Sequence, residues 1–277
     1  MDAAPTNGPA DAGTDRCFGS KVDLFGVDVS VTTYGHATAA IMDAARNHRS
    51  YAVSALAVHG LMEAVGDPAF RAVVNEIDLV TPDGQPVRWA MNRLHHAGLD
   101  DRVYGPDLTW KVIEAAADEG VGIYLFGSTE ETCDAFRDEI GRRHPSAKVV
   151  DVQPDRFRDA TPAEDEADIA RMNASGAGVV LVGRGCPRQE RWVAAHRGRV
   201  NAAMLAVGAA FDYGAGNLAP PPAWMQRTGL QWLFRLGQEP RRLWRRYLVT
   251  NSRFLAHFGR ALVRSRLGFS HRVGAAR

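Results

Sequence analysis

The chain has 277 residues, of which 45% are hydrophobic and 23% charged. These values exclude a disulfide-rich miniprotein, a collagen-like or coiled-coil chain, and wholesale disorder. Three cysteines, Cys17, Cys133 and Cys186, lie far apart and form no Cys-x-x-Cys pair. This argues against a disulfide framework or a thiolate metal site, and it favours a reducing compartment.

The formal net charge of +1 averages over two unlike segments. Residues 224–277 contain twelve arginines, no lysine and one acid, Glu239, so they carry +11 and the other 223 residues carry −10. Such asymmetry indicates an anionic partner for the basic segment, either nucleic acid or a membrane surface.

The predicted elements alternate along the chain from about residue 21. Short runs rich in β-branched residues predict strands at 27–31, 51–58, 77–81, 122–126, 147–152, 178–182 and 203–207. Amphipathic stretches between them predict helices at 35–47, 106–119, 129–144, 161–175 and 187–196, several of which begin with Thr or Pro. This order predicts an α/β fold, with a mostly parallel, Rossmann-like sheet flanked by helices and a basic amphipathic helical appendage at the C-terminus.

The two ends of the chain differ from this middle part. Residues 1–20 are expected to form a disordered leader, because residues 1–15 are rich in Ala, Pro, Gly and Asp. They lack the basic start and the apolar run of a signal peptide. Residues 21–223 are expected to form the α/β domain, and 224–277 the appendage. No stretch approaches 18 consecutive apolar residues, so we expect no membrane-spanning helix.

Ligands of an open parallel sheet bind at the carboxyl ends of its strands. The Gly183-Arg184-Gly185-Cys186-Pro187-Arg188-Gln189-Glu190 segment follows one predicted strand and opens a helix. Its glycines permit close backbone approach and the helix N-terminus suits an anion, but a plain tight turn fits as well. The Ser128-Thr129 pair after another strand is equally open, because it can simply cap the next helix. Neither matches a Walker loop or a complete dinucleotide fingerprint, which disfavours a dinucleotide-dependent epimerase or dehydrogenase.

Two charged residues stand out near other predicted strand ends. Asp83, in Thr81-Pro82-Asp83-Gly84, follows a strand directly, although Asp-Gly is also a common turn pair. Arg102, in Arg102-Val103-Tyr104-Gly105-Pro106-Asp107-Leu108, precedes a helix that begins with Pro and can face phosphate or solvent.

Together these motifs resemble the WecG/TagA/CpsF glycosyltransferase family. The resemblance runs from about residue 51 to 248 and includes three further segments: Val207-Gly208-Ala209-Ala210-Phe211-Asp212-Tyr213-Gly214-Ala215-Gly216, Gly229-Leu230-Gln231-Trp232-Leu233-Phe234-Arg235-Leu236, and Glu239-Pro240-Arg241-Arg242-Leu243-Trp244-Arg245-Arg246-Tyr247. It implies transfer of a sugar from a nucleotide donor to a lipid-linked acceptor, with inversion and with no metal or cofactor. The absence of an Asp-x-Asp motif is consistent with this.

The resemblance also assigns roles to residues. Asp83 is expected to be the general base, and Arg102 and Gln189 to act in substrate binding and catalysis. Arg188 is expected to contact substrate, where the family often has lysine. The nucleotide pocket is expected to involve Gly183, Gly185, Gly208, Phe211 and Asp212, although Asp212 can equally be structural.

The chain departs from the family pattern near the second predicted strand. A Thr-x-Asn-type segment of the family reads Ser54-Ala55-Leu56-Ala57-Val58-His59 here. A polar contact to the donor sugar or to the acceptor is therefore missing, or is moved to Ser54 or His59. The identity of the sugar stays open.

The appendage combines apolar and basic residues at helical spacing. Trp232, Leu236, Trp244 and Leu248 alternate with arginines, among which we expect Arg235, Arg241, Arg242 and Arg245 to contact the diphosphate. Such helices can rest on an anionic membrane, or can dock on the domain with a solvated basic face. Binding of nucleic acid through the same arginines is the alternative function, and it leaves the enzyme-like motifs unexplained.

The sequence therefore predicts an inverting, metal-independent glycosyltransferase of the hexosyl or N-acetylhexosaminyl type. It would move a sugar from a UDP-sugar to a polyprenyl-diphosphate-linked acceptor in the synthesis of a cell-surface polysaccharide or wall polymer. We expect it in the cytoplasm, on the inner face of the cell membrane, with no nucleic acid as partner and with self-association through exposed apolar surface.

Overall fold

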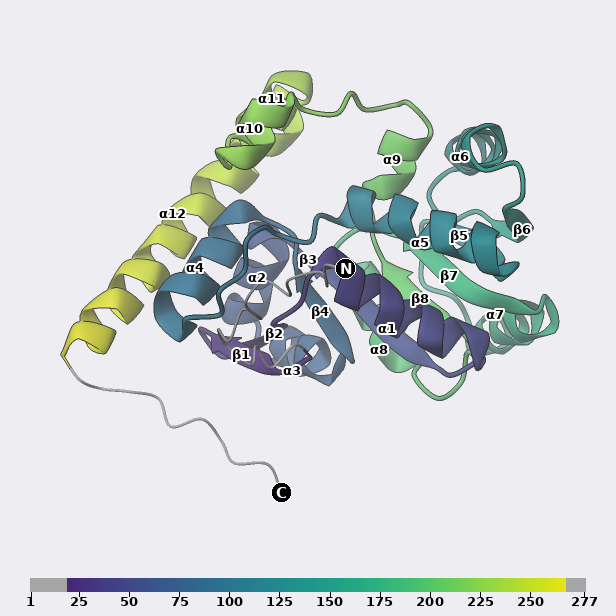
Figure 1. Cartoon of the computed structure of the whole chain (residues 1–277), viewed down its shortest axis with the longest axis horizontal. Coiled ribbons are helices and arrows are strands. Elements are labelled where there is room, and N and C mark those ends of the chain that lie inside the picture. Colours follow the sequence, from purple (N-terminus) through teal and green to yellow (C-terminus); the bar gives the residue numbers. More distant parts are fainter. Residues whose placement is uncertain (1–18, 268–277) are drawn as a thin grey trace, which may run out of the picture.

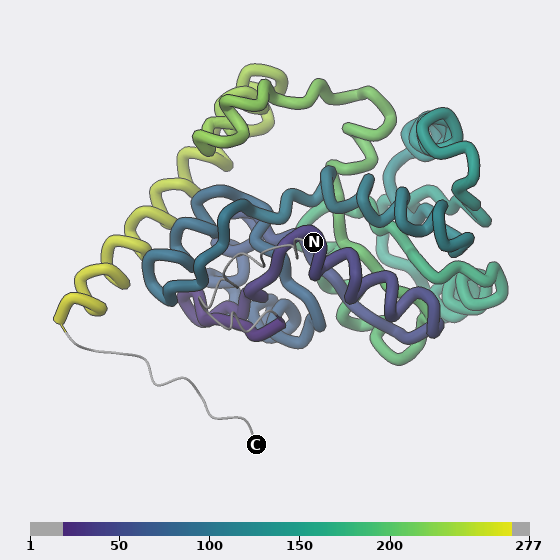
Figure 2. Tube along the Cα trace, viewed as in Figure 1, coloured from purple at the N-terminus to yellow at the C-terminus, as the bar shows by residue number. Residues whose placement is uncertain are grey.

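A computed structural model describes residues 19–267 (Figures 1 and 2). The expected leader therefore lies almost entirely outside the described residues, as do Cys17 and the last ten residues of the appendage. The centre of the molecule is a six-stranded, wholly parallel sheet. Its strands lie in the order β4 (Leu79–Pro82), β3 (Tyr51–Leu56), β8 (Ala203–Ala206), β7 (Ala177–Gly183), β5 (Gly122–Gly127) and β6 (Lys148–Gln153).

The inner strands are mostly apolar because both faces of the sheet are covered. In β7, Val179 and Leu181 belong to one hydrophobic cluster, and Val180 and Val182 belong to the other. Alternate residues of a strand point to opposite faces, so these four side chains join two separate cores. The sheet is the middle layer of three.

The helices divide between the two clusters (Figure 1). One cluster packs α1 (Tyr34–Arg46), α5 (Gly105–Glu119), α6 (Glu130–Arg143) and α9 (Ala210–Gly214) against the sheet. The other packs α2 (Val58–Gly66), α3 (Pro68–Glu76), α4 (Gln85–His95), α7 (Pro162–Ala174) and α8 (Arg188–Ala195).

The bounds of the five predicted helices agree with α1, α5, α6, α7 and α8 within one or two residues. The Thr33, Thr129 and Thr161 hydroxyls accept hydrogen bonds from the first turns of α1, α6 and α7, which satisfies backbone donors that have no partner within the helix. At α7 the side chain of Glu164 also accepts from the backbone of Thr161, completing a capping box.

The first predicted strand was wrongly assigned to the parallel sheet. Val27–Ser30 forms β2, which pairs antiparallel with β1 (Lys21–Leu24) in a separate two-stranded sheet. Only the two residues Phe25 and Gly26, both with positive φ, connect the strands. So short a connection permits an antiparallel hairpin and excludes the long crossover that parallel pairing requires.

Three helices near the second strand escaped the prediction. The predicted strand 51–58 ends at Leu56, and α2 begins at Val58. Helices α2, α3 and α4 have only nine to eleven residues each. Their periodic patterns are therefore too short to separate from those of buried strands.

The appendage consists of α10 (Ala223–Arg227), α11 (Gln231–Gln238) and the long α12 (Pro240–Arg266). Helix α12 runs beside α2 and α4 (Figure 1). Its only buried residues among those described are Leu243, Thr250 and Phe254. The ring of Phe254 lies 6.1 Å from that of Phe25 in the β1–β2 turn. The appendage is therefore docked along one narrow side, and the rest of its surface is exposed.

Candidate active site

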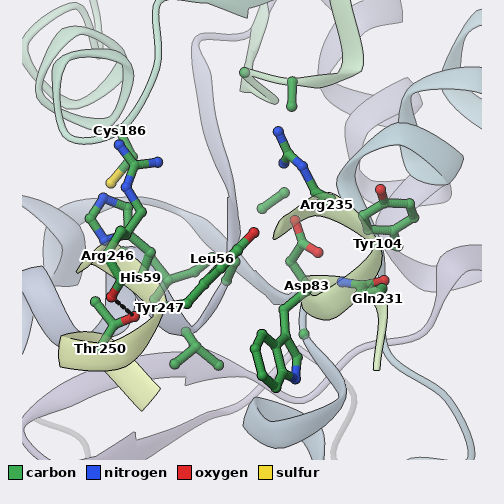
Figure 3. A pocket seen from close by; sticks show the side chains of 18 of the residues that line it. Leu56, His59, Asp83, Tyr104, Cys186, Gln231, Arg235, Arg246, Tyr247 and Thr250 are labelled. Atoms are coloured by element: carbon green, nitrogen blue, oxygen red, sulfur yellow. Dashed lines mark hydrogen bonds between the residues drawn. The ribbon is translucent and has the colours of Figure 1, made fainter. Parts of the chain in front are cut away.

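A cavity of about 670 Å³ opens at the carboxyl ends of the parallel strands (Figure 3). Its floor is formed by the residues that end or follow β3, β4, β7 and β8, and α11 and α12 of the appendage form one wall. In Figure 3, Asp83, Arg235, Tyr104 and Gln231 gather on one side of this cavity. The site is thus shared between the α/β domain and the appendage.

Asp83 follows β4 directly and is held by the backbone. Its N–H donates to the carbonyl of Leu56 at 3.3 Å, and its carboxyl accepts a backbone hydrogen bond from Gly105. Burial raises the pKa of Asp83 to about 6, although Arg102 and Arg235 act to lower it. A carboxylate with this pKa is ionised at neutral pH and is a stronger base than an exposed aspartate.

Arg102 lies behind the cavity wall and does not line it. The residue is only 3% exposed, and its guanidinium stacks 4.2 Å from the ring centroid of Tyr104. It donates to the carbonyl of Asp83 at 3.4 Å, to Gln226 Oε1 at 3.2 Å and to Gln231 Oε1. Arg102 therefore connects the Asp83 turn to α10 and α11, and it adds positive potential close to the carboxylate.

The glycine-rich turn after β7 carries Gln189 into the cavity wall. Gln189 Oε1 accepts from the N–H of Gly185 at 3.1 Å, and its Nε2 donates to Glu190 Oε1 at 2.9 Å. A Cβ atom on Gly208 would lie 2.9 Å from Gln189 Oε1, so this glycine gives the amide its space. Gly183, Gly185, Gly208 and Gln189 all line the cavity, and they lie together as predicted.

Three other predicted site residues do not line the cavity. Ser54 is fully buried and lies 3.5 Å from Glu190 Oε1. Phe211 is also buried, and a Cβ atom on Gly183 would lie 2.6 Å from its ring. Arg188 pairs with Asp155 at 3.0 Å. Ser54 and Phe211 thus contact residues that line the cavity, whereas Arg188 is engaged by the loop after β6.

Asp212 lines the cavity and also a neighbouring hollow that it shares with Arg242. Burial raises the pKa of Asp212, while a hydrogen bond from Asn217 acts to lower it. The position of Asp212 is compatible with both expected roles, a contact with ligand and a structural carboxylate.

The arginines of the appendage fall into two groups. Arg235 and Arg242 line the cavity, whereas Arg241 and Arg245 are exposed and lie outside it. Glu239 lies between the first two, 3.6 Å from Arg235 and 2.8 Å from Arg242. Arg235 and Arg242 thus bring positive charge to the cavity wall formed by the appendage and share Glu239 as an ion-pair partner.

Sequence reasoning missed several residues of the cavity wall. Tyr104, Tyr213, Gln231 and Arg246 line it, and so does His59, the alternative position for the polar contact. Arg246 follows Arg242 by four residues, so helical spacing could have placed both on one face. No pattern in the sequence points to Tyr213, because its place depends on how α9 meets α11. Within residues 19–267, no three His, Cys, Asp or Glu side chains are grouped as metal ligands would be.

This arrangement combines a desolvated carboxylate, a glycine-rich turn and facing arginines, as a transferase that uses an anionic leaving group requires. The family model described as Glycosyl transferase WecG/TagA/CpsF family matches residues 22–268. The chain belongs to this family. It is therefore a glycosyltransferase of cell-surface polymer synthesis, and in general the family uses a nucleotide-sugar donor and a lipid-linked acceptor.

In the part of the chain that the structure describes, no helix is both long and apolar enough to cross a bilayer. Helix α12, the longest at 27 residues, carries arginines along its whole length.

Proposed function

We propose that the protein is an inverting hexosyl- or N-acetylhexosaminyltransferase. It takes the sugar from a UDP-linked donor and passes it to a polyprenyl-diphosphate-linked acceptor in the synthesis of a surface polysaccharide or wall polymer. The observation that carries this proposal is the position of Asp83, whose half-buried carboxylate faces a cavity with Arg235 and Arg242 in its wall.

The reaction is a single displacement. An acceptor hydroxyl attacks C1 of the donor sugar from the face opposite the diphosphate, and Asp83 takes the hydroxyl proton. The bond from C1 to the phosphate oxygen breaks, and its electron pair leaves with UDP. One carboxylate is enough, because inversion needs no covalent intermediate on the enzyme. A pKa of about 6 makes Asp83 an effective base at neutral pH.

The departing diphosphate is stabilised without a metal or a cofactor. Arg235 and Arg242 supply positive charge from the appendage, and the Gly183–Gly185 backbone together with Gln189 supplies neutral donors from the domain. Arg102 does not line the cavity, but its positive charge lies close to Asp83 behind the cavity wall and stabilises the carboxylate. The support for this scheme is the shared cavity and the family to which the chain belongs.

We propose further that the appendage holds the enzyme on the inner face of the cell membrane. Trp244 and Leu248 are 52% and 63% exposed on α12, and Arg241 and Arg245 lie beside them in the sequence. Exposed aromatic and aliphatic side chains can enter the headgroup region while arginines contact anionic lipids. Self-association through the same apolar surface stays a prediction.

A donor panel tests the proposed reaction. Purified protein is incubated with UDP-hexoses and UDP-N-acetylhexosamines in turn, together with a water-soluble diphosphate-linked sugar acceptor, and the products are analysed by mass spectrometry and NMR. We expect one UDP-sugar to be transferred with inverted anomeric configuration. A retained configuration, or transfer only from donors with another nucleotide, would contradict the proposal.

A further inference from the structure

The cavity around Asp83 continues well beyond this residue, along α12. Residues that line it occur on α12 from Arg242 to Phe258, which corresponds to about 24 Å of helix. The opposite wall includes Val58, His59 and Gly60 of α2 and Trp89 of α4. The cavity is therefore a groove with Asp83 toward one end. We call this extension the α12 groove.

The polarity of the α12 groove falls along its length. Arg242 and Arg246 line it first, together with Leu243 and Tyr247. The polar but uncharged Thr250 and Asn251 follow, and three apolar residues come last. These are Phe254, Leu255 and Phe258. In Figure 3, Arg246, His59 and Thr250 lie on the side of the cavity away from Asp83 and Arg235. Among the α12 residues that line the groove, positive charge is thus confined to the part of the helix before Thr250.

The apolar end of the groove is firmly built yet open to solvent. The rings of Phe254 and Phe258 stack with centroids 5.9 Å apart, and Phe254 also packs against Phe25 of the hairpin. Leu255 nevertheless remains 66% exposed, and Trp89 of α4 is 41% exposed. Large apolar side chains left exposed along a cavity indicate an apolar occupant.

The order of these surfaces matches an amphiphile with an anionic head and a hydrocarbon tail. A sugar or a nucleotide would fill the charged part and would leave the exposed side chain of Leu255 uncovered. We propose that the α12 groove binds the first isoprene units of the acceptor lipid and so aligns its diphosphate-linked sugar with Asp83. This inference rests on the proposed function, because it takes the lipid-linked acceptor as the occupant.

Binding of two simple diphosphates tests the groove without any sugar transfer. Farnesyl diphosphate and dimethylallyl diphosphate share a headgroup and differ by two isoprene units, and isothermal titration of the full chain, free of membranes and detergent, measures both. We expect farnesyl diphosphate to bind about tenfold more tightly or better, because its extra units bury apolar surface. Equal affinities would overturn the proposal.

Two matched variants of α12 locate the effect. Leu255→Gln should remove most of the preference for farnesyl diphosphate, and Leu255→Met should keep it. Val249→Gln is the control, because Val249 is 52% exposed on the same helix but does not line the groove. A loss of preference as large in Val249→Gln as in Leu255→Gln would also overturn the proposal, because it would show a general effect of apolar surface.

The experiment separates the groove from the proposed reaction. Tight binding of farnesyl diphosphate that depends on Leu255, together with no transfer from any UDP-sugar, would support the proposed lipid-binding groove and contradict the proposed transfer reaction. Transfer to the water-soluble acceptor without any preference for the longer chain would do the reverse.

Discussion

The parallel-sheet domain and the appendage contribute to the same cavity, but they are stabilised very differently. Asp83 follows β4 and Gln189 lies in the first turn of α8, above a sheet whose inner strands are mostly buried. Arg235 comes from α11, which has no buried residue, and Arg242 comes from α12, most of whose residues are exposed. The domain therefore positions the base rigidly, whereas the positive charge depends on the docking of a weakly buried helix.

Because of this difference, substitutions in the domain and in the appendage should impair the enzyme in different ways. A change in the domain that disturbs Asp83 should abolish chemistry while the appendage stays docked. A change in the appendage should weaken stabilisation of the diphosphate or binding to the membrane while the domain stays folded. Each of the following variants affects one side of this division.

Asp83→Asn should have the largest effect on turnover. Removing the general base should lower kcat by about 10²–10⁴-fold, because the amide cannot take the acceptor proton. Steady-state assays with the water-soluble acceptor measure this. The affinity for UDP, measured by titration, should stay within about threefold and serves as the control. Turnover close to that of the wild type would remove Asp83 from the mechanism.

The same variant should also make the domain more stable at neutral pH. The pKa of Asp83 is higher in the folded chain than its ordinary value of 3.8, so ionisation of Asp83 destabilises the folded state. This destabilisation is complete above about pH 6, and it is absent below about pH 4, where the carboxyl is protonated in both states. We expect Asp83→Asn to raise the free energy of unfolding at pH 7 by about 1–3 kcal/mol. Denaturant unfolding at pH 7 and pH 4 tests this, and an increase of the same size at both pH values would contradict it.

Arg235→Gln should lower turnover by about 10- to 100-fold, because one charge-assisted contact with the diphosphate is lost. Arg241→Gln, which removes an equal charge outside the cavity, should change turnover with the water-soluble acceptor less than twofold. Inhibition by UDP should weaken in the first variant only. Equal losses in the two variants would mean that the appendage acts through its overall charge and not through a specific contact.

The pH dependence of turnover should follow the titration of Asp83. Catalysis requires the carboxylate, so kcat/KM should be half-maximal at about pH 6 and fall tenfold per pH unit below that value. A pH series from 4.5 to 8 with substrates well below their KM values measures the profile. The residual activity of Asp83→Asn should lack this inflection, and an inflection near pH 4 in the wild type would argue against a desolvated base.

The outer face of α12 should affect membrane binding alone. The double variant Trp244→Ser with Leu248→Ser should bind anionic liposomes about tenfold less tightly, because two exposed apolar side chains no longer enter the headgroup region. Sedimentation with liposomes at two salt concentrations measures this. Turnover of the water-soluble acceptor should change less than twofold, and an unaltered liposome affinity would show that this face does not contact the membrane.

Excess EDTA should leave turnover unchanged, which is the smallest of the expected effects. Arg235, Arg242 and backbone donors take the place of a divalent cation in the proposed scheme, so turnover should stay constant on chelation. Activity that is lost with EDTA and restored by magnesium or manganese would reject the scheme.

The sequence predicts most of the sheet and the central part of the cavity. Asp83 and Gln189 follow strands of a parallel sheet, so topology alone brings them to one edge. The ion pair of Arg188 with Asp155, which holds Arg188 outside the cavity, was not predictable. Asp155 is 33 residues away in sequence and belongs to the loop after β6. Arg246 was missed for a related reason. Its spacing places it on the face of Arg242, but only the docking of α12 shows which face meets the domain.

The contact of Phe25 with Phe254 also has a consequence for biosynthesis. It joins residues 229 positions apart, so α12 can take its place only after the chain up to Phe254 has left the ribosome. The strands, the hairpin and the Asp83 turn are all made earlier. During synthesis the base is therefore present before the arginines that face it, and a nascent chain has an incomplete active site until α12 is released.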